Sequence, residues 1–254
     1  MTDWVPAEVA RTYNEIARNY RESTELPLRV YVDRPTVLRL AGPLEGKRVL
    51  DLACGEGHYS RLLKQNGAKE VLGVDISREM IMLAEEEEAV RPLGCLYQEG
   101  DVMGLSLGES FDLVVGVYLL NYAADRNQLR AMCGAIARHL KPGGRFVGLN
   151  SNMLLGPGRF ADYRKYQLQM SGRSVREDGE AILIEFFNRD GTVARFENYY
   201  LSPETYKWAF DEVGLHDFSW QNVAVSEAGL DAFPDGYWDA LLAAPATIGM
   251  VARK

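Results

Sequence analysis

The stretch "VLDLACGEGHYS", residues 49–60, decides the fold of this 254-residue chain. An apolar run passes through Asp51, and Gly55 and Gly57 follow within a short turn. Two glycines placed so soon after a buried strand let the backbone turn tightly and approach a ligand that a side chain would obstruct. The stretch therefore predicts the first strand of a parallel sheet, ending in a ligand-binding turn at its carboxyl end.

Strand-like apolar runs alternate with helical patterns on both sides of this turn. Between residues 47 and 150 these runs are "RVLDLA", "EVLGVDI", "LGCLYQEGD", "FDLVVGVYLL" and "GRFVGLN". Because the runs are continuous rather than alternating, they are typical of strands buried on both faces of a parallel sheet. In the segment before the fifth run, Asp125 and Gln128 are spaced as a capping box at a helix start. The "KPGG" at 141–144 is expected to stop that helix.

The rest of the chain completes this pattern. "AILIEFF" and "TVARFENYYL", joined by "NRDG", predict a β-hairpin inserted after the fifth strand. A helix is predicted to start at Ser202 with Pro203 at its first position, and "LHDFSWQNV" and "ATIGMVAR" supply two last strands. The prediction is a doubly wound, Rossmann-like α/β fold with a seven-stranded, mostly parallel sheet.

The same reading predicts one domain over residues 1–254 with four parts. These are a helical N-terminal cap (1–42), a cofactor-binding core (43–150), a β-rich insertion or lid (151–201), and a C-terminal helix with the last strands (202–254).

Composition narrows the class of partner. The chain is 47% hydrophobic and 25% charged, with a formal net charge of -8, and it lacks the clustered Lys and Arg of a nucleic-acid surface. A small molecule is the expected partner. Cys54, Cys95 and Cys133 have neither CxxC nor zinc-type spacing, which predicts reduced thiols and no metal site. The N-terminus lacks a signal-peptide core and no apolar run is long enough to span a membrane, so a cytoplasmic location is expected. Nothing in the sequence indicates the oligomeric state.

Acidic residues at the strand ends indicate the ligand. Asp75 ends the second strand, where a carboxylate can accept hydrogen bonds from a ribose diol. A dinucleotide site needs room for a pyrophosphate and commonly reads G-x-G-x-x-G, but here Ser60 replaces the third glycine and Asp51 precedes the turn. A carboxylate at that place suits a ligand with ammonium and sulfonium groups, which favours S-adenosylmethionine.

Four segments in order, "VLDLACGEG", "LGVDIS", "EGDVMGL" and "LKPGGRFV", resemble the motifs of the class I S-adenosylmethionine-dependent methyltransferases across residues 48–148. "YNEIARNY" at 13–20 resembles the N-terminal helix that many small-molecule members fold over the cofactor. Ala53 stands where that family often has a third glycine. The resemblance implies methyl transfer from S-adenosylmethionine, leaving S-adenosylhomocysteine as product.

Carried over residue by residue, the resemblance implies a cofactor site made of Tyr13, Tyr20, Arg34, Asp51, Ala53, Gly55, Asp75, Ile76, Met80, Asp101 and Val102. The glycine turn would line the methionine end, and Asp75 would bind the ribose. Ile76 and Val102 would sandwich the adenine, with Asp101 at its amino group. The two tyrosines and the arginine would close over the amino acid end.

The acceptor is expected beyond the fourth strand. Tyr118, Asn121 and Tyr122 follow that strand, and Asn150 ends the fifth. No catalytic base is assigned, and none of the three histidines is selected for that role. Aromatic residues of the insertion and of the next helix, among them Tyr163 and Trp208, offer stacking surface for a flat substrate.

The tail "FSWQNVAVSEAGLDAFPDGYWDAL" is similar to the azapteridine N-methyltransferases of toxoflavin-type biosynthesis. This resemblance favours N-methylation of a small heteroaromatic or secondary-metabolite acceptor, with O- and C-methylation left open. Two alternatives remain: a non-catalytic protein of this fold that binds S-adenosylmethionine or S-adenosylhomocysteine, and a nicotinamide-linked oxidoreductase.

Overall fold

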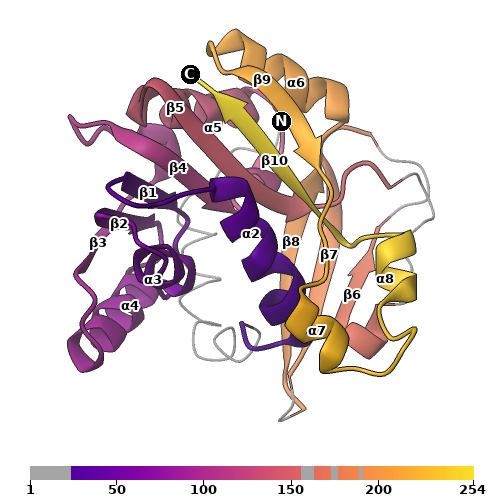
Figure 1. Ribbon diagram of the computed structural model, residues 1–254. Helices are drawn as coiled ribbons and strands as arrows, with labels where there is room; N and C mark the ends of the chain where they lie inside the picture. Colours follow the sequence, from indigo (N-terminus) through magenta and orange to yellow (C-terminus); the bar gives the residue numbers. More distant parts are fainter. Residues whose placement is uncertain (1–23, 156–162, 173–176, 189–190) are drawn as a thin grey trace.

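A seven-stranded sheet forms the centre of the molecule (Figure 1). The structure is a computed structural model that describes residues 24–155, 163–172, 177–188 and 191–254. The sheet order is β3-β2-β1-β4-β5-β10-β9. Its strands are β1 (Arg48–Leu52), β2 (Glu70–Asp75), β3 (Cys95–Glu99), β4 (Phe111–Val117), β5 (Leu140–Ser151), β9 (His216–Gln221) and β10 (Thr247–Arg253). Only β10 runs antiparallel to its neighbours, β5 and β9, which confirms the predicted mostly parallel sheet.

Helices cover both faces of this sheet, which explains the continuous apolar runs in its strands. On one face lie α2 (Arg34–Ala41), α3 (His58–Gln65) and α4 (Arg78–Val90), and on the other lie α5 (Arg126–His139) and α6 (Pro203–Glu212) (Figure 1). Val49, Leu50 and Leu52 of the central strand β1 are fully buried between the two layers. Among the described residues, no helix combines the length and the apolar character that crossing a bilayer requires.

Capping side chains fix where the helices begin. Ser202 accepts a hydrogen bond from the Thr205 N–H at the start of α6, as predicted. Asp125 caps α5, but Gln128 reaches back to the N–H of Ala124 rather than to that of the cap residue.

The helix α5 ends directly before the predicted stop at 141–144. The helix ends at His139, and "KPGG" lies inside β5, because Leu140 already pairs with Phe111 of β4. The turn geometry of Gly143, with φ at 75°, is used inside the strand rather than at a helix end. Strand pairing therefore decides the boundary, and the glycines follow it.

The segment after β5 forms a second, antiparallel sheet of order β6-β7-β8. The predicted hairpin is present as β7 (Glu180–Phe187) and β8 (Val193–Tyr200). The sequence analysis missed β6 (Leu168–Ser171), whose four residues are too few for a periodic pattern. Alternate residues of β7 are buried, so one face of this small sheet packs against the rest of the molecule.

Two short helices, α7 (Glu227–Asp231) and α8 (Asp239–Ala243), lie beside the small sheet (Figure 1). The ring of Tyr166 stacks on that of Trp238 with 5.5 Å between centroids. The hydroxyl of Tyr163 donates to the Ala244 carbonyl oxygen at 2.7 Å. Tyr163, expected to offer a stacking surface, therefore belongs to the core. Trp208 is only partly buried and packs under the guanidinium of Arg126.

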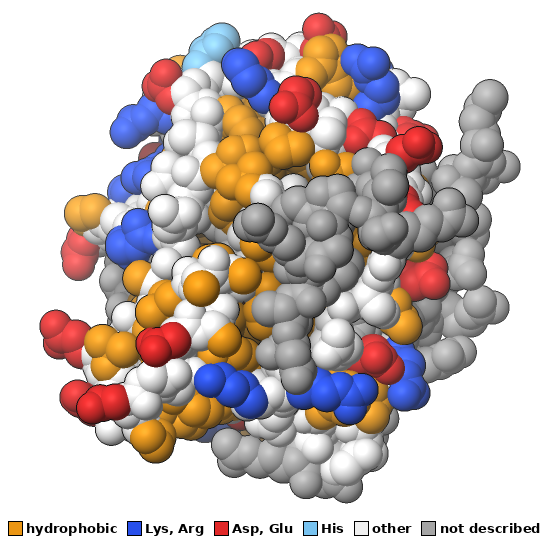
Figure 2. Space-filling model, turned by 90° about the vertical axis from the view of Figure 1, so that its right-hand side faces the viewer, with side chains coloured by type: hydrophobic (Ala, Val, Ile, Leu, Met, Phe, Trp, Pro, Cys, Tyr) orange, Lys and Arg blue, Asp and Glu red, His pale blue; other side chains and the backbone are white. Residues whose placement is uncertain are grey.

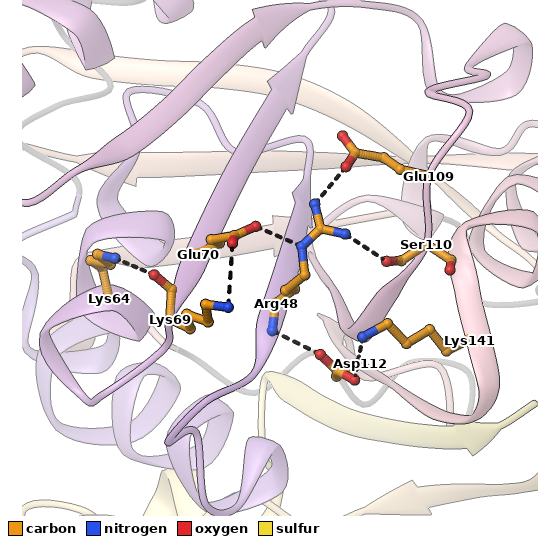
Figure 3. A network of polar contacts seen from close by, with 8 residues as sticks. All are labelled: Arg48, Lys64, Lys69, Glu70, Glu109, Ser110, Asp112 and Lys141. Carbon is orange, nitrogen blue, oxygen red and sulfur yellow. Dashed lines mark hydrogen bonds and ion pairs between the residues drawn. The ribbon is translucent and has the colours of Figure 1, made fainter.

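Polar contacts tie the amino ends of the central strands together (Figure 3). The Arg48 side chain of β1 donates to Glu70 at 2.6 Å and to Glu109, and its backbone N–H donates to Asp112 at 2.9 Å. Lys141 completes the network by donating to Asp112 at 2.8 Å. Charge pairs thus consolidate the end of the sheet that lies opposite the carboxyl ends of these strands.

Figure 2 shows the side of the molecule that lies to the right in Figure 1. Hydrophobic side chains gather near its centre, and Lys, Arg, Asp and Glu side chains are interspersed around them.

Candidate active site

A cleft opens at the carboxyl ends of β1, β2 and β4, where the glycine turn was expected to place it. It encloses about 970 Å³ of atom-free space, part of it open to solvent. The predicted site residues that line it are Ala53, Gly55, Asp75, Ile76, Met80, Asp101, Val102, Tyr118 and Tyr122.

The turn after β1 uses backbone conformations that favour glycine. Gly55 and Gly57 have φ of 55° and 81°, and Ala53 has φ of 58°. Ala53 thus occupies the left-handed region at the position where the family often has a glycine. Such a residue costs roughly 1–2 kcal/mol, a cost that the surrounding turn has to offset.

Asp75 connects the turn to the end of β2. Its carboxylate accepts hydrogen bonds from the N–H groups of Gly55, at 2.8 Å, and of Ser77, at 2.9 Å. Burial raises the pKa of this carboxyl, and the backbone hydrogen bonds oppose that shift. Because a carboxylate offers about four lone-pair sites, Asp75 retains acceptor capacity toward a diol in the cleft.

Asp51 lies behind the turn and is not part of the cleft wall formed by the described residues. Its carboxylate accepts a hydrogen bond of 2.6 Å from the Ser60 hydroxyl of α3. Burial, together with the nearby charge of Asp75, raises the pKa of Asp51 to about 7. Ser60, which argued against a dinucleotide motif in the sequence, is therefore the side chain that holds this carboxyl.

The far end of the cleft is apolar with one acidic residue. Ile76, Met80 and Val102 contribute its apolar wall. Asp101 also lines the cleft, and its carboxylate accepts a hydrogen bond of 3.0 Å from the N–H of Met103. Asp101 thus combines a capping role for the short helix Val102–Gly104 with a place beside the ligand space.

The N-terminal predictions have mixed outcomes. Tyr13 and Tyr20 lie outside the described residues. Arg34 does not line the cleft, because its guanidinium donates to the Thr24 carbonyl at 2.8 Å and to Glu25 at 2.6 Å. The arginine that reaches the cleft is Arg29, which the sequence analysis did not select.

Tyr118 lines the cleft in a backbone conformation with φ of 58°. Its hydroxyl donates to the carboxylate of Asp33 at 2.7 Å, and the guanidinium of Arg29 lies 4.2 Å from its ring centroid. Arg29 and Asp33 belong to a single π-helical turn, Arg29–Asp33, in which their side chains pair at 3.8 Å. Their four-residue spacing was the only sequence signal for this pair.

Asn121 and Asn150 were predicted near the acceptor, but the structure places both outside the cleft wall, with no exposed surface. The amide of Asn150 lies against that of Asn121 and hydrogen-bonds the Tyr206 hydroxyl, with 2.9 Å between the two atoms. These side chains join the region after β4 to β5 and α6.

His58, the first residue of α3, lines the cleft next to Tyr59. Burial, aided by the positive charge of Arg34, lowers the pKa of His58 to about 4, so its imidazole is neutral at physiological pH. Its place directly after the glycine turn was the available sequence signal. Cys54, Cys95 and Cys133 are buried free thiols. In the part of the chain that the structure describes, no group of three or more His, Cys, Asp or Glu side chains could hold a metal ion.

Comparisons with known proteins agree with this geometry. Residues 49–144 match a family model described as a methyltransferase domain. The cypemycin N-terminal methyltransferase of a Streptomyces species is 38% identical over 105 residues, which cover 40% of this chain and 41% of that protein. A ubiquinone biosynthesis O-methyltransferase of Coxiella burnetii is 35% identical over 112 residues, covering 43% of this chain and 46% of the relative. The match thus spans less than half the length of these curated relatives.

Solved structures resemble nearly the whole chain. The CcbJ methyltransferase of Streptomyces caelestis has a TM-score of 0.67 at 19% identity, covering 95% of this chain and 97% of its own. An S-adenosylmethionine-dependent methyltransferase of Mesorhizobium loti has a TM-score of 0.63 at 20% identity, covering 91% and 99%. At such identities the likeness shows the fold. Residues 49–144 thus match a methyltransferase domain, and the fold of nearly the whole chain resembles that of solved S-adenosylmethionine-dependent methyltransferases.

Proposed function

We propose that the protein transfers the methyl group of S-adenosylmethionine to a small-molecule acceptor. The observation that carries this proposal is the position of Asp75. This carboxylate is buried, is fixed by two backbone N–H groups and lines the cleft, as an acceptor of hydrogen bonds from a ribose diol has to do.

The remaining cleft residues suit the other parts of the same ligand. The methionine end would follow the turn at Ala53 and Gly55, with the negative charge of Asp51 close behind it. The adenine would lie against Ile76 and Val102. Met80 would extend that apolar wall.

A bound sulfonium supplies a methyl group that is already activated toward nucleophiles. The chain then has to hold the acceptor in line with the methyl–sulfur bond and exclude water, and such positioning can supply roughly 7–11 kcal/mol in favourable cases. A base is needed only where the acceptor nucleophile carries a proton at the working pH.

For the acceptor we propose a small heteroaromatic or secondary metabolite, with N-methylation favoured over O- or C-methylation. The similarity of the tail to azapteridine N-methyltransferases supports this class. The curated relatives act in different ways, since one is an O-methyltransferase and another an N-terminal methyltransferase. These relatives therefore do not decide which atom is methylated, and the shape and polarity of the acceptor site must do so.

Isothermal titration with S-adenosylmethionine and S-adenosylhomocysteine, with NADH as control, tests the cofactor. We expect micromolar binding of both sulfur ligands and none of NADH, and the reverse result would favour a nicotinamide-linked oxidoreductase. A screen for methylated products then separates an enzyme from a protein that only binds the cofactor. Failure of both sulfur ligands to bind would overturn the proposal.

A further inference from the structure

A second cavity adjoins the cleft on the side of the small sheet. It comprises about 370 Å³ of atom-free space, a figure that includes space open to solvent. Arg29, Tyr118 and Tyr122 line both spaces and so form the boundary between them. The small sheet contributes an apolar wall, made of Leu168, Met170, Ile184, Phe186 and Phe196. A molecule in this cavity would meet the contents of the cleft across Tyr118.

The boundary contains a buried chain of polar contacts. Tyr118 donates to one carboxylate oxygen of Asp33 at 2.7 Å, and Thr247 donates to the other at 3.2 Å. Asp33 has no exposed surface. Because burying a carboxylate is costly even when it is hydrogen-bonded, an aspartate here needs a reason beyond packing.

The backbone conformation of Tyr118 also indicates a functional role for this boundary. A φ of 58° is rarely adopted by a bulky residue. The N–H of Tyr118 donates to the Leu149 carbonyl at 2.6 Å, which helps to hold this conformation. Strained residues of this kind concentrate at functional sites, where the surrounding structure maintains them.

We propose that the second cavity binds the body of the methyl acceptor and that Tyr118 takes the acceptor's proton while passing its own to Asp33. This inference rests on the proposed function. Tyr118 is then a catalytic residue, and Asp33 a positioning residue that acts through it.

The proton and electron balance of the step is complete. The acceptor's lone pair forms the new bond to the methyl carbon, and the carbon–sulfur bond breaks with its electron pair left on sulfur. The proton of the acceptor moves to the Tyr118 oxygen as the phenolic proton moves to the Asp33 carboxylate. The sulfonium charge and the carboxylate charge disappear together, and Asp33 afterwards returns its proton to solvent.

The lining defines the substrate class. Among the described residues that line the second cavity, Arg29 is the only charged one, and its guanidinium lies 4.8 Å from the Phe186 ring centroid. No carboxylate among these lining residues would compensate for the cost of burying a cationic acceptor there. The cavity therefore fits a neutral, flat, largely apolar molecule whose nucleophile is a ring N–H or an aromatic hydroxyl.

Several charged and titratable groups face this pair. Arg29 and Arg34 lower the pKa of Asp33, but burial outweighs them and raises it. Tyr118 also faces Tyr59, and burial raises its phenolic pKa well above the usual value. The relay thus works with an ionised Asp33 and a neutral Tyr118, and it stops when acid protonates Asp33.

The binding test uses the protein saturated with S-adenosylhomocysteine and the neutral bicyclic probes 2-naphthol, 2-quinolone and indole, with 2-naphthylmethylamine as the cationic comparison. We expect at least one neutral probe to bind and the amine to fail. Ile184→Trp should weaken probe binding by roughly tenfold or more, because the larger ring overfills the cavity. If S-adenosylhomocysteine binds and no neutral probe does, or if Ile184→Trp leaves probe binding unchanged, the cavity assignment fails while the cofactor proposal stands.

The relay is tested with the bound probe as methyl acceptor. Tyr118→Phe and Asp33→Asn should each lower kcat by about 10²–10⁴-fold and keep the affinity for S-adenosylhomocysteine within about twofold. The wild-type kcat, measured at saturating S-adenosylmethionine, should fall at acid pH, and Asp33→Asn should remove that limb. Tyr166→Phe, a buried tyrosine outside both cavities, is the matched control and should keep the wild-type rate. A bound probe that is never methylated, or an acid limb that persists in Asp33→Asn, would overturn the relay.

Discussion

The hydroxyl of Tyr97 lies directly against Gly57, so that a β-carbon added to this glycine would stand 2.4 Å from it. The same ring lies 2.8 Å from the place of a β-carbon at Gly73 in β2. One tyrosine of β3 thus supports the ligand turn from below, and two glycines from different elements make room for it. Both glycines are needed for space, and Gly57 also for its φ of 81°.

Gly57→Ala should destabilise the protein by about 1–3 kcal/mol, since the new methyl group adds a collision to an unfavourable backbone conformation. Thermal unfolding measures the loss. Gly108→Ala is the matched control, because Gly108 has φ of 68° and open space around the added β-carbon. Equal losses in the two variants would show that the contact with Tyr97 contributes nothing.

Asp75→Asn should weaken binding of S-adenosylmethionine by about 1.5–3 kcal/mol, the usual contribution of hydrogen bonds to a charged group. Calorimetry gives the affinity directly. Asp112→Asn, at the opposite end of the sheet, should leave the affinity unchanged. Wild-type affinity in Asp75→Asn would remove the ribose assignment.

Binding of the positively charged cofactor should strengthen as pH rises toward neutrality and then level off. Asp51 has a pKa raised from 3.8 to about 7 in the free protein, and a cation beside it favours the ionised form, so binding below pH 7 must release a proton. Titration at about pH 5.5 and about pH 8 measures the change. Asp51→Asn should flatten the dependence, while an unchanged slope would assign it to another group such as Asp75.

The raised pKa of Asp51 also affects folding, and here stability falls as pH rises, whereas cofactor affinity increases. Because the folded state holds the Asp51 proton more tightly than the unfolded chain, this group makes the free protein less stable as pH rises from 3.8 to about 7. In chemical denaturation across that interval, the stability of Asp51→Asn should fall less, or rise more, with pH than that of the wild type.

Tyr206→Phe should cost about 1–3 kcal/mol of stability, because it removes a buried hydroxyl that hydrogen-bonds the amide of Asn150 and donates to the Leu120 carbonyl. Cofactor affinity should not change, since neither residue lines the cleft. Tyr237→Phe, whose hydroxyl bonds the Lys165 carbonyl at an exposed place, is the control and should cost less. If Tyr206→Phe lost cofactor affinity, the hydrogen bonds among Asn121, Asn150 and Tyr206 would have to be assigned a role in cofactor binding.

Most of the residues expected at the cofactor do line the cleft, because their positions follow from local sequence. Gly55, Asp75 and Asp101 follow strand ends, and strand ends in a parallel sheet meet at one edge. Of the residues expected near the acceptor, only Tyr118 and Tyr122 line the cleft, since these positions depend on tertiary contacts. Asn150 faces α6 rather than the cleft, and the bond between Asp33 and Tyr118 joins residues 85 positions apart.

Two further misses have identifiable physical causes. Arg34 was selected for its charge, but Arg29, one turn earlier, is the arginine that reaches the cleft, and a π-helical turn changes which side chains share a face. The strand β6 is defined by its pairing with β7 and by little in its own four residues. Tertiary packing decides both which arginine reaches the cleft and where β6 pairs. Sequence periodicity predicts neither.

The placement of β10 between β5 and β9 also constrains how the chain can assemble during synthesis. The ribosome delivers β5 more than sixty residues before β9, yet β9 cannot join the sheet until residues 247–253 have emerged. Until then the edge of β5 is an open strand with unpaired backbone groups, a common starting point for aggregation. Nascent chains stalled before residue 247 should therefore depend on chaperones far more than the finished protein does.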